Sequence, residues 1–307
     1  MLNIENVSVS FPGAHTVHAL RNVTLSLKPG EKAAIIGETG SGKSVLLLAI
    51  LQLLSANAQV SGIVRWHERD LLKLTPKELR KVRGAEIAYV PQGGGASLHP
   101  LLTVGFQVAE PIITHRKVSR EAALNQGVTL LERFHIKPAV TRAKGYPHTY
   151  SGGMRQRAMV AMGISAGAQV VLADEPTKGL DEARISQVEE AFHSLVDQAI
   201  LCVTHDLRFA RAVAETICVM YAGEQVEVAP TEQLLNEPLH PYTQDMVAAL
   251  PENGLRSTAG FASSRTIETR GCPYRDRCRF AHDKCVQDPP MQTIYSGHMV
   301  RCWLYEA

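Results

Sequence analysis

Residues 32–44 read KAAIIGETGSGKS, and this stretch decides the fold. A short apolar run, residues 32–36, leads directly into the pattern G-x-x-x-x-G-K-S, and a second apolar run, residues 45–54, suits a buried helix. Between a buried strand and a helix, such a loop turns backbone N–H groups toward phosphate oxygens. The stretch therefore predicts an α/β fold with a phosphate loop. The loop comprises Gly37, Glu38, Thr39, Gly40, Ser41, Gly42, Lys43 and Ser44.

Two side chains of the phosphate loop have direct chemical roles in this pattern. Lys43 is expected to bind the β- and γ-phosphates of a nucleoside triphosphate, and the hydroxyl of Ser44 to ligate Mg²⁺. These residues alone leave open a chance match to the pattern, so further motifs elsewhere in the chain are needed to support nucleotide binding.

A pair of acids follows another apolar run, residues 170–173, and a third apolar run covers residues 199–203. Short apolar runs of this kind suit central strands of a parallel sheet, and open α/β sheets place their functional groups at the carboxyl ends of such strands. Asp174 is expected to hold Mg²⁺ and Glu175 to polarise the attacking water. Taken alone, two acids at a strand end are equally expected to cap a helix.

Composition narrows the classes of partner and the compartment. The 307 residues carry 32 Lys and Arg against 30 Asp and Glu, a net charge of +2, which implies neither nucleic acid nor an anionic lipid surface as partner. The apolar runs fall well short of the roughly 20 residues that a membrane-spanning helix needs. No basic and apolar leader stands at the N-terminus, so the chain is expected in the cytoplasm, where structural disulfides are rare.

Changes of character along the chain suggest its organisation. Residues 1–238 are expected to form the nucleotide-binding domain, with a helical insert at about residues 93–160 where charged helical faces replace strand signals. Residues 2–11 and 23–27 alternate as strands do, which adds an antiparallel β portion. Residues 239–307, rich in Pro, Ser, Arg and Cys, are expected to form a small C-terminal extension.

Several further features stand in a fixed order along the chain. They are Phe11, Gln92, the stretch Ser151-Gly152-Gly153-Met154-Arg155-Gln156, Asp181 and His205. Singly, each feature has an ordinary explanation as a surface, core or strand-end residue. Together with the phosphate loop they resemble the ABC ATPases over nearly the whole chain. The stretch is similar to the signature motif of that family, Gln92 to its Q-loop residue, Asp181 to its D-loop residue and His205 to its switch residue.

The resemblance implies a P-loop NTPase core of the ABC ATPase type and a role for each feature. Phe11 would stack on adenine, and Gln92 would sense Mg²⁺ and nucleotide. Ser151, Gly152 and Gly153 would face the phosphate loop of an opposing subunit, so that two chains enclose each ATP. Asp181 would link the two sites across that dimer, and His205 would contact the γ-phosphate. Asp174, Glu175 and His205 are all present, so we expect ATP hydrolysis.

Three stretches are similar to the oligopeptide, dipeptide and nickel importers: residues 70–84, residues 146–148 and the sequence HPYT at residues 240–243. The resemblance implies ATP-driven import of short peptides, with nickel or a metal chelate as the alternative cargo. It implies a paralogous second ATPase in a heterodimer, two membrane permeases and an extracytoplasmic binding protein. The chain would lie at the cytoplasmic face of the inner membrane. A rival of another class is a soluble ABC ATPase without a transport role.

Four of the six cysteines lie close together near the C-terminus. Clustered thiolates suit zinc or an iron–sulfur cluster, and their spacing is wider than the close pairs usual in zinc sites. The resemblance implies a [4Fe–4S] cluster, with zinc, plain thiols and disulfides as alternatives. Cys202 and Cys218 fall in apolar runs and are expected in the core. The four expected ligands are Cys272, Cys278, Cys285 and Cys302.

Overall fold

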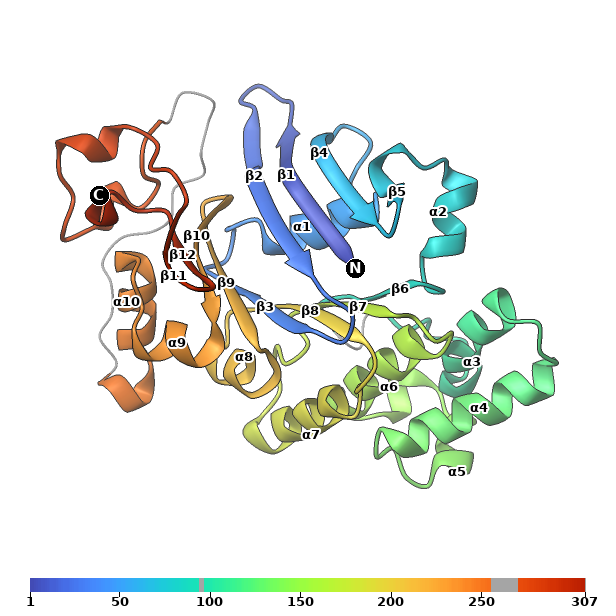
Figure 1. Ribbon diagram of the computed structural model, residues 1–307. Coiled ribbons are helices and arrows are strands. Elements are labelled where there is room, and N and C mark those ends of the chain that lie inside the picture. Colours follow the sequence, from blue (N-terminus) through green and yellow to red (C-terminus); the bar gives the residue numbers. More distant parts are fainter. Residues whose placement is uncertain (94–96, 255–269, 307) are drawn as a thin grey trace. The chain divides into compact units, whose positions relative to one another are not determined.

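The computed structural model describes residues 1–93, 97–254 and 270–306 (Figure 1). Residues 94–96 of the expected helical insert, and residues 255–269 and 307 of the expected C-terminal extension, lie outside the described residues. The chain folds into two compact units. The first comprises residues 1–27, 33–73 and 205–307, and the second comprises residues 28–32 and 74–204.

An antiparallel sheet forms the N-terminal part of the first unit, which confirms the predicted antiparallel portion (Figure 1). Along β1, the apolar side chains Leu2, Ile4, Val7 and Val9 are buried and alternate with more exposed ones, as expected of a strand with one face on a core. The strand order is β2-β1-β4-β5, with β1 at Leu2–Phe11, β2 at Val17–Leu27, β4 at Gln59–Trp66 and β5 at Arg69–Asp70.

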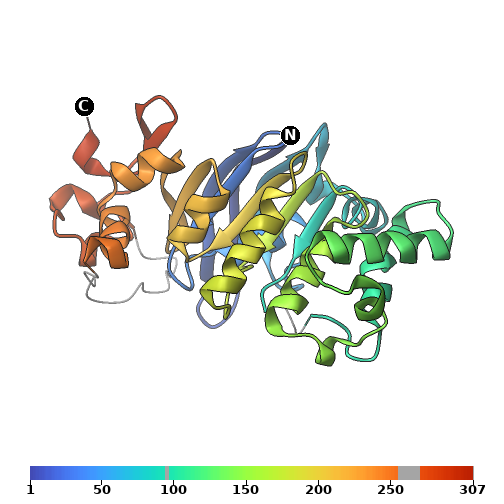
Figure 2. The same cartoon turned by 90° about the horizontal axis from the view of Figure 1, so that it is seen from below.

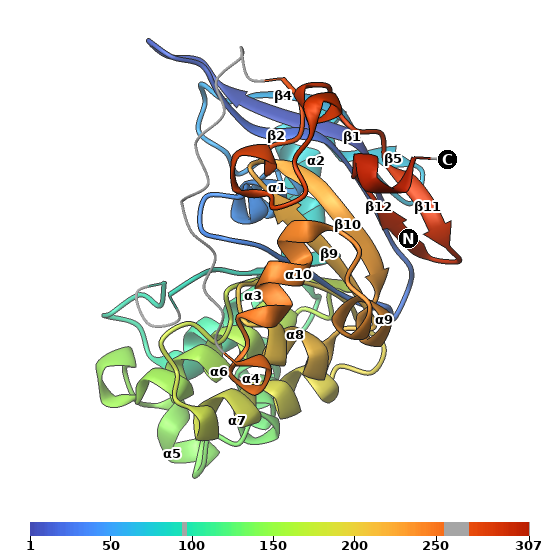
Figure 3. The ribbon, with the colours of Figure 1, turned by 90° about the vertical axis from the view of Figure 1, so that its left-hand side faces the viewer.

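A second group of strands joins the phosphate-loop strand to the C-terminus. β3 pairs in parallel with β9, with Ile36 opposite Val219, and β10 then pairs antiparallel with both β9 and β12. The C-terminal strands therefore extend the sheet that carries the phosphate loop, as Figure 3 shows for β9, β10, β12 and β11. Their bounds are Lys32–Ile36 for β3, Thr216–Tyr221 for β9, Glu224–Pro230 for β10, Gln292–Tyr295 for β11 and His298–Val300 for β12.

The helices of the first unit are short. The α-helices are α1 (Lys43–Ile50), α8 (Leu207–Val213), α9 (Thr231–Asn236) and α10 (Pro241–Ala248). The 3-10 helices are η1 (Leu71–Lys73), η3 (Pro251–Asn253), η4 (Arg275–Arg277), η5 (Asp283–Val286) and η6 (Trp303–Tyr305).

The second unit holds three parallel strands in the order β8-β7-β6. Their bounds are Ile87–Val90 for β6, Val170–Asp174 for β7 and Ala199–Thr204 for β8. Every residue of β7 and β8 is buried, which confirms that these apolar runs are central strands of a covered parallel sheet.

The helical part of the second unit spans α3 to α6, where α3 packs against α4 and α6 (Figure 2). The helices of this unit are α2 (Pro76–Val82), α3 (Val104–His115), α4 (Arg120–Arg133), α5 (Ala139–Ala143), η2 (Pro147–Thr149), α6 (Gly152–Ile164) and α7 (Glu182–His193). Across the described residues, no helix has the length and apolar character needed to cross a lipid bilayer.

Candidate functional site

The phosphate loop connects β3 to α1 and requires glycine at two of its positions. Gly42 caps α1 with φ at +95°, and a Cβ atom there would lie 2.4 Å from the carbonyl oxygen of Ala19. At Gly37, a Cβ atom would lie 2.1 Å from the carbonyl oxygen of Met220. Any larger residue at either position would push the loop away from the strands behind it. The loop conformation therefore depends on the glycines that the sequence pattern singled out.

Lys43 folds back over the phosphate loop. Its Nζ donates to the carbonyl oxygens of Gly37 at 2.7 Å and Glu38 at 3.0 Å, and only 6% of the residue is exposed. A buried ammonium held by neutral carbonyl oxygens is well placed to exchange them for phosphate oxygens, whose negative charge makes them stronger partners. Lys43 is the first residue of α1, and Ser44 is the second.

Two side chains from the C-terminal part of the chain hold the second residue of the phosphate loop. The backbone N–H of Glu38 donates to the hydroxyl of Tyr242 at 2.9 Å, and Arg277 donates to the carboxylate of Glu38 at 3.0 Å. Burial raises the pKa of Tyr242, so this hydroxyl stays protonated at neutral pH. Sequence reasoning missed both contacts, because the partners lie 204 and 239 positions apart along the chain.

The acids of the second unit lie where the sequence places them, at the carboxyl end of β7. Asp174 is 3% exposed and accepts a hydrogen bond from the hydroxyl of Tyr89 at 3.2 Å. Glu175 is 8% exposed, has φ at +48° and donates its backbone N–H to Val203 at 2.8 Å. A non-glycine residue in the left-handed region is uncommon and marks a position where the backbone aims a side chain. The contact between Tyr89 and Asp174 was not predicted from the sequence. The signal that could have indicated it is the position of Tyr89 on β6, the strand that pairs with β7.

The expected signature and D-loop residues lie at the N-termini of two helices. Ser151 is the N-cap of α6, and its hydroxyl accepts from the N–H of Met154 at 3.3 Å. Asp181 is the N-cap of α7 and accepts from the N–H of Arg184 at 3.0 Å. Both are standard caps that leave the other N–H groups of the first turn available. A Cβ atom on Gly153 would meet the side chain of Arg184 at 3.0 Å, so glycine lets α6 and α7 approach closely.

Three other expected residues lie at the ends of strands. Phe11 ends β1, where it pairs with Val17, and is partly exposed. Gln92 is exposed in the turn after β6, and His205 is exposed directly after β8. His205 falls in the first unit, and Gln92 in the second.

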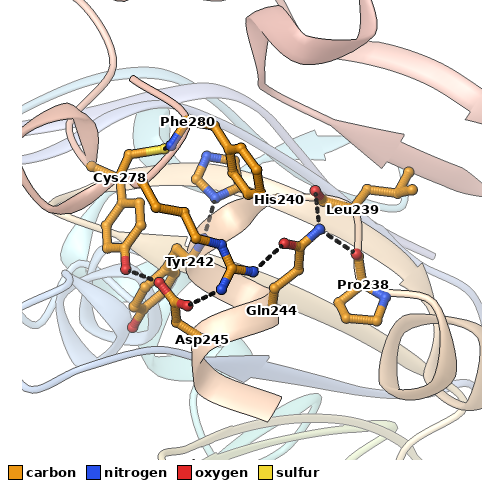
Figure 4. A network of polar contacts seen from close by, with 10 residues as sticks. Pro238, Leu239, His240, Tyr242, Gln244, Asp245, Cys278 and Phe280 are labelled. Atoms are coloured by element: carbon orange, nitrogen blue, oxygen red, sulfur yellow. Dashed lines mark hydrogen bonds and ion pairs between the residues drawn. The ribbon is translucent and has the colours of Figure 1, made fainter. Parts of the chain in front are cut away.

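A pocket in the C-terminal segment brings together the four cysteines that the sequence indicates. Cys272, Cys278, Cys285 and Cys302 line it together with His240. Burial raises the pKa of Cys272 to about 12 and that of Cys302 to about 11, so without a compensating cation these thiols stay protonated at neutral pH. Figure 4 shows Cys278, whose sulfur accepts from the N–H of Phe280. Within the described ranges, no group of three or more His, Cys, Asp and Glu is arranged to hold a metal ion. Cys202 and Cys218 are fully buried in the two units, as predicted.

A buried carboxylate ties the C-terminal strands to the rest of the first unit. Glu227 on β10 is fully buried and accepts the N–H groups of Leu239 and His240, each at 2.8 Å. Its Oε1 also lies 2.7 Å from Nε2 of His298 on β12. The ring Nδ1 of His240 accepts from the N–H of Tyr242 and so caps α10. Sequence reasoning missed this cluster entirely.

Comparison with known families decides the assignment. A family model described as "ABC transporter" matches residues 20–178, just over half of the chain. This chain belongs to the ABC transporter ATPase family. A second model, "Oligopeptide/dipeptide transporter, C-terminal region", matches residues 226–285 of this ATPase. The resemblance drawn from the motifs, down to the peptide-transporter branch, is confirmed, and with it the enzyme class of an ATP-hydrolysing transporter subunit.

Similar proteins extend over the whole chain. The dipeptide transport ATP-binding protein DppD of Bacillus subtilis is 37% identical over 100% of this chain and 95% of its own length. The oligopeptide transport ATP-binding protein OppD of the same organism is 35% identical over 99% and 88%. A putative peptide import ATP-binding protein of Brucella abortus is 35% identical over 98% and 94%.

A solved structure agrees on the fold. The ATP-binding cassette MJ0796, in a dimeric post-hydrolysis state with ADP and Pi, superposes with a TM-score of 0.66 at 28% identity. The match covers 75% of this chain and 99% of that one. The ABC ATPase fold is thereby confirmed.

Proposed function

We propose that this ABC ATPase hydrolyses ATP to drive the import of short peptides across the cytoplasmic membrane. The observation that carries the proposal is the match of residues 226–285 to the C-terminal region of oligopeptide and dipeptide transporters. The names of its relatives, which are dipeptide, oligopeptide and peptide transport proteins, point the same way. No observation on this chain favours nickel or a metal chelate over peptides as cargo.

In the proposed reaction, each unit contributes its own groups. The phosphate loop, residues 37–44, binds the phosphates, with Lys43 on the β- and γ-phosphates and Ser44 on Mg²⁺. The second unit contributes Asp174 toward Mg²⁺ and Glu175 to polarise the attacking water. The left-handed backbone and low exposure of Glu175 support a role beyond helix capping.

The remaining expected residues have supporting roles in the proposal. The roles are adenine stacking for Phe11, sensing of Mg²⁺ and nucleotide for Gln92, and contact with the γ-phosphate for His205. Ser151, Gly152 and Gly153 serve the nucleotide of an opposing ATPase subunit, and Asp181 links the two sites. The N-terminal position of the signature residues on α6 supports this, because helix starts favour phosphate.

The proposed assembly is a membrane complex. Two permeases span the bilayer, a second, paralogous ATPase completes the nucleotide sites, and an extracytoplasmic binding protein delivers peptide. The dimeric state of the related cassette supports a two-ATPase arrangement. The chain would lie peripherally at the cytoplasmic face.

We further propose that the cysteine pocket holds a [4Fe–4S] cluster. Such a cluster takes one thiolate on each iron and so needs four cysteines around a volume rather than around a single point. Four thiols that line one pocket support the proposal, because they offer the required number of ligands. The cluster would fasten a segment that is too small to build a core of its own.

The test is a pull-down of the tagged chain from its own cells in mild detergent, with bound proteins identified by mass spectrometry. Two permeases and a second ATPase are expected, and the ligand of any retained binding protein then gives the cargo. Recovery of soluble proteins alone would contradict a transporter role and favour a soluble ABC ATPase. A binding protein that carries nickel would contradict peptide import.

A further inference from the structure

Residues of α10 and η4, far along the chain, contact the phosphate loop at Glu38. Its N–H is held by Tyr242 of α10, and its carboxylate by Arg277 of η4. Its carbonyl oxygen is one of the two that receive Lys43. The residue that positions the phosphate-binding lysine is therefore itself positioned by two residues outside the loop.

Arg277 is held in a defined place. Its side chain is 9% exposed and also donates to the hydroxyl of Tyr221 at 3.2 Å. The guanidinium lies 5.7 Å from the ring centre of Tyr221 and 5.4 Å from that of Tyr274, within the range of cation–π attraction. Tyr221, Tyr242 and Tyr274 pack on one another with ring centres 4.6 to 5.3 Å apart. Arg277 and Tyr242 thus belong to one packed group.

The charge on Glu38 makes this arrangement relevant to ATP. A carboxylate in a loop that receives phosphates repels them, and Coulomb repulsion is stronger at a partly buried site than in water. The guanidinium of Arg277 lies 3.0 Å from the carboxylate of Glu38, offsets its charge and orients it toward Arg277. Without Arg277, the uncompensated negative charge of Glu38 would repel the phosphates of ATP and weaken ATP binding.

The position of Arg277 depends in turn on the cysteine pocket. It lies in a tight turn in which the N–H of Arg275 donates to Cys272 and the N–H of Cys278 donates to Arg275. Cys272 and Cys278 both line the pocket and pack against the core that contains the three tyrosines. The C-terminal segment therefore has a direct structural connection to the phosphate loop.

We propose that Arg277 and Tyr242 are positioning residues for the phosphate loop, through which the C-terminal segment sets the affinity of this subunit for ATP. This inference concerns nucleotide affinity and is independent of the cargo. If peptide import failed as the function, the inference would still stand or fall on ATP binding alone.

The test is equilibrium binding of a fluorescent ATP analogue to the purified full-length chain. Arg277→Gln should weaken binding about tenfold, as for a moderate coupling between sites. Arg277→Lys, which keeps the charge but not the planar fork, should fall between this variant and the parent. The matched control is Arg279→Gln, because Arg279 is in the same segment but contacts Gln244 and Asp245. It should bind as the parent does.

A double-mutant cycle separates positioning from a general structural role. Glu38→Gln should bind the analogue roughly two- to fivefold more tightly, because a repelling charge is gone. In that background, Arg277→Gln should change the affinity less than about twofold. Tyr242→Phe should weaken binding about fivefold through the lost hydrogen bond to Glu38.

Two results would overturn the proposal. One is an unchanged affinity for the analogue in folded Arg277→Gln. The other is that Arg277→Gln lowers the affinity equally in the parent and in the Glu38→Gln background, since a merely structural role would not depend on that carboxylate. If Arg277→Gln does not fold, Glu38→Gln still decides the matter, because weaker binding by that variant contradicts the electrostatic argument.

Discussion

Glu227→Gln should destabilise the first unit strongly, although the substitution changes neither size nor shape. The carboxylate is fully buried and takes the N–H groups of Leu239 and His240 and the ring of His298. Glutamine has one oxygen where glutamate has two, so its NH₂ group must face one of these donors. An orphaned buried donor costs about 1–3 kcal/mol, and more than one of these three contacts is weakened when a carboxylate oxygen is replaced. We expect a loss of about 3 kcal/mol in the free energy of unfolding.

Urea unfolding of the full-length chain, followed by circular dichroism, measures this loss. For a slope of about 3 kcal/mol per molar urea, the midpoint should fall by about 1 M. The control is Glu232→Gln, because Glu232 forms an exposed ion pair with Arg211 at the surface and should leave the midpoint unchanged. A midpoint for Glu227→Gln that matches the control would refute the assignment of Glu227 as the anchor of the C-terminal strands.

Three further outcomes are expected. Glu175→Gln in the assembled transporter should lower the rate of ATP hydrolysis at least about a hundredfold while ATP still binds, and near-normal turnover would exclude Glu175 as the water-polarising group. Burial lowers the pKa of His240 to about 4, so the folded state resists its protonation; the free energy of unfolding should fall by about 3 kcal/mol as the pH drops from 6.5 to 4. His240→Asn keeps the cap of α10 and should remove that part of the acid sensitivity, seen as a smaller midpoint shift between the two pH values. Gly42→Ala should weaken ATP binding at least about tenfold, because its Cβ would meet Ala19 in a left-handed backbone; unchanged binding would show that the loop tolerates the displacement.

Local patterns made the phosphate loop and the central strands predictable. The apolar runs at residues 32–36, 170–173 and 199–203 match β3, β7 and β8 within one residue at each end. These runs are long enough to be buried and too short for most helices, and polar or glycine residues end them. The caps at Ser151 and Asp181 are local as well, because each side chain accepts the N–H of the residue three places ahead.

The end of α1 shows where such patterns fail. The apolar run predicts a helix over residues 45–54, whereas α1 spans Lys43–Ile50. Gln52 takes a left-handed backbone, with φ at +50°, and Leu53 is 43% exposed. Hydrophobicity alone does not indicate where the chain leaves the core, because leucine suits both the last turn of a helix and the loop beyond it.

The contacts around Glu38 and Glu227 could not be predicted for a different reason. Glu38 and Arg277 are 239 positions apart, and Glu227 and His298 are 71 apart. Which distant residues meet depends on the packing of whole elements, such as the addition of β12 to the edge of β10. The four cysteines were an exception, because their clustering in the sequence and their chemistry together indicated a shared site.

Peptide uptake tests the central claim most directly. Cells that lack this chain, complemented with the parent or with Glu175→Gln at equal expression, are supplied with a radiolabelled dipeptide or short oligopeptide. Uptake should require the parent chain and stay at the background level with Glu175→Gln. Peptide uptake that proceeds equally in cells without the chain, while radioactive nickel uptake is lost, would contradict the account.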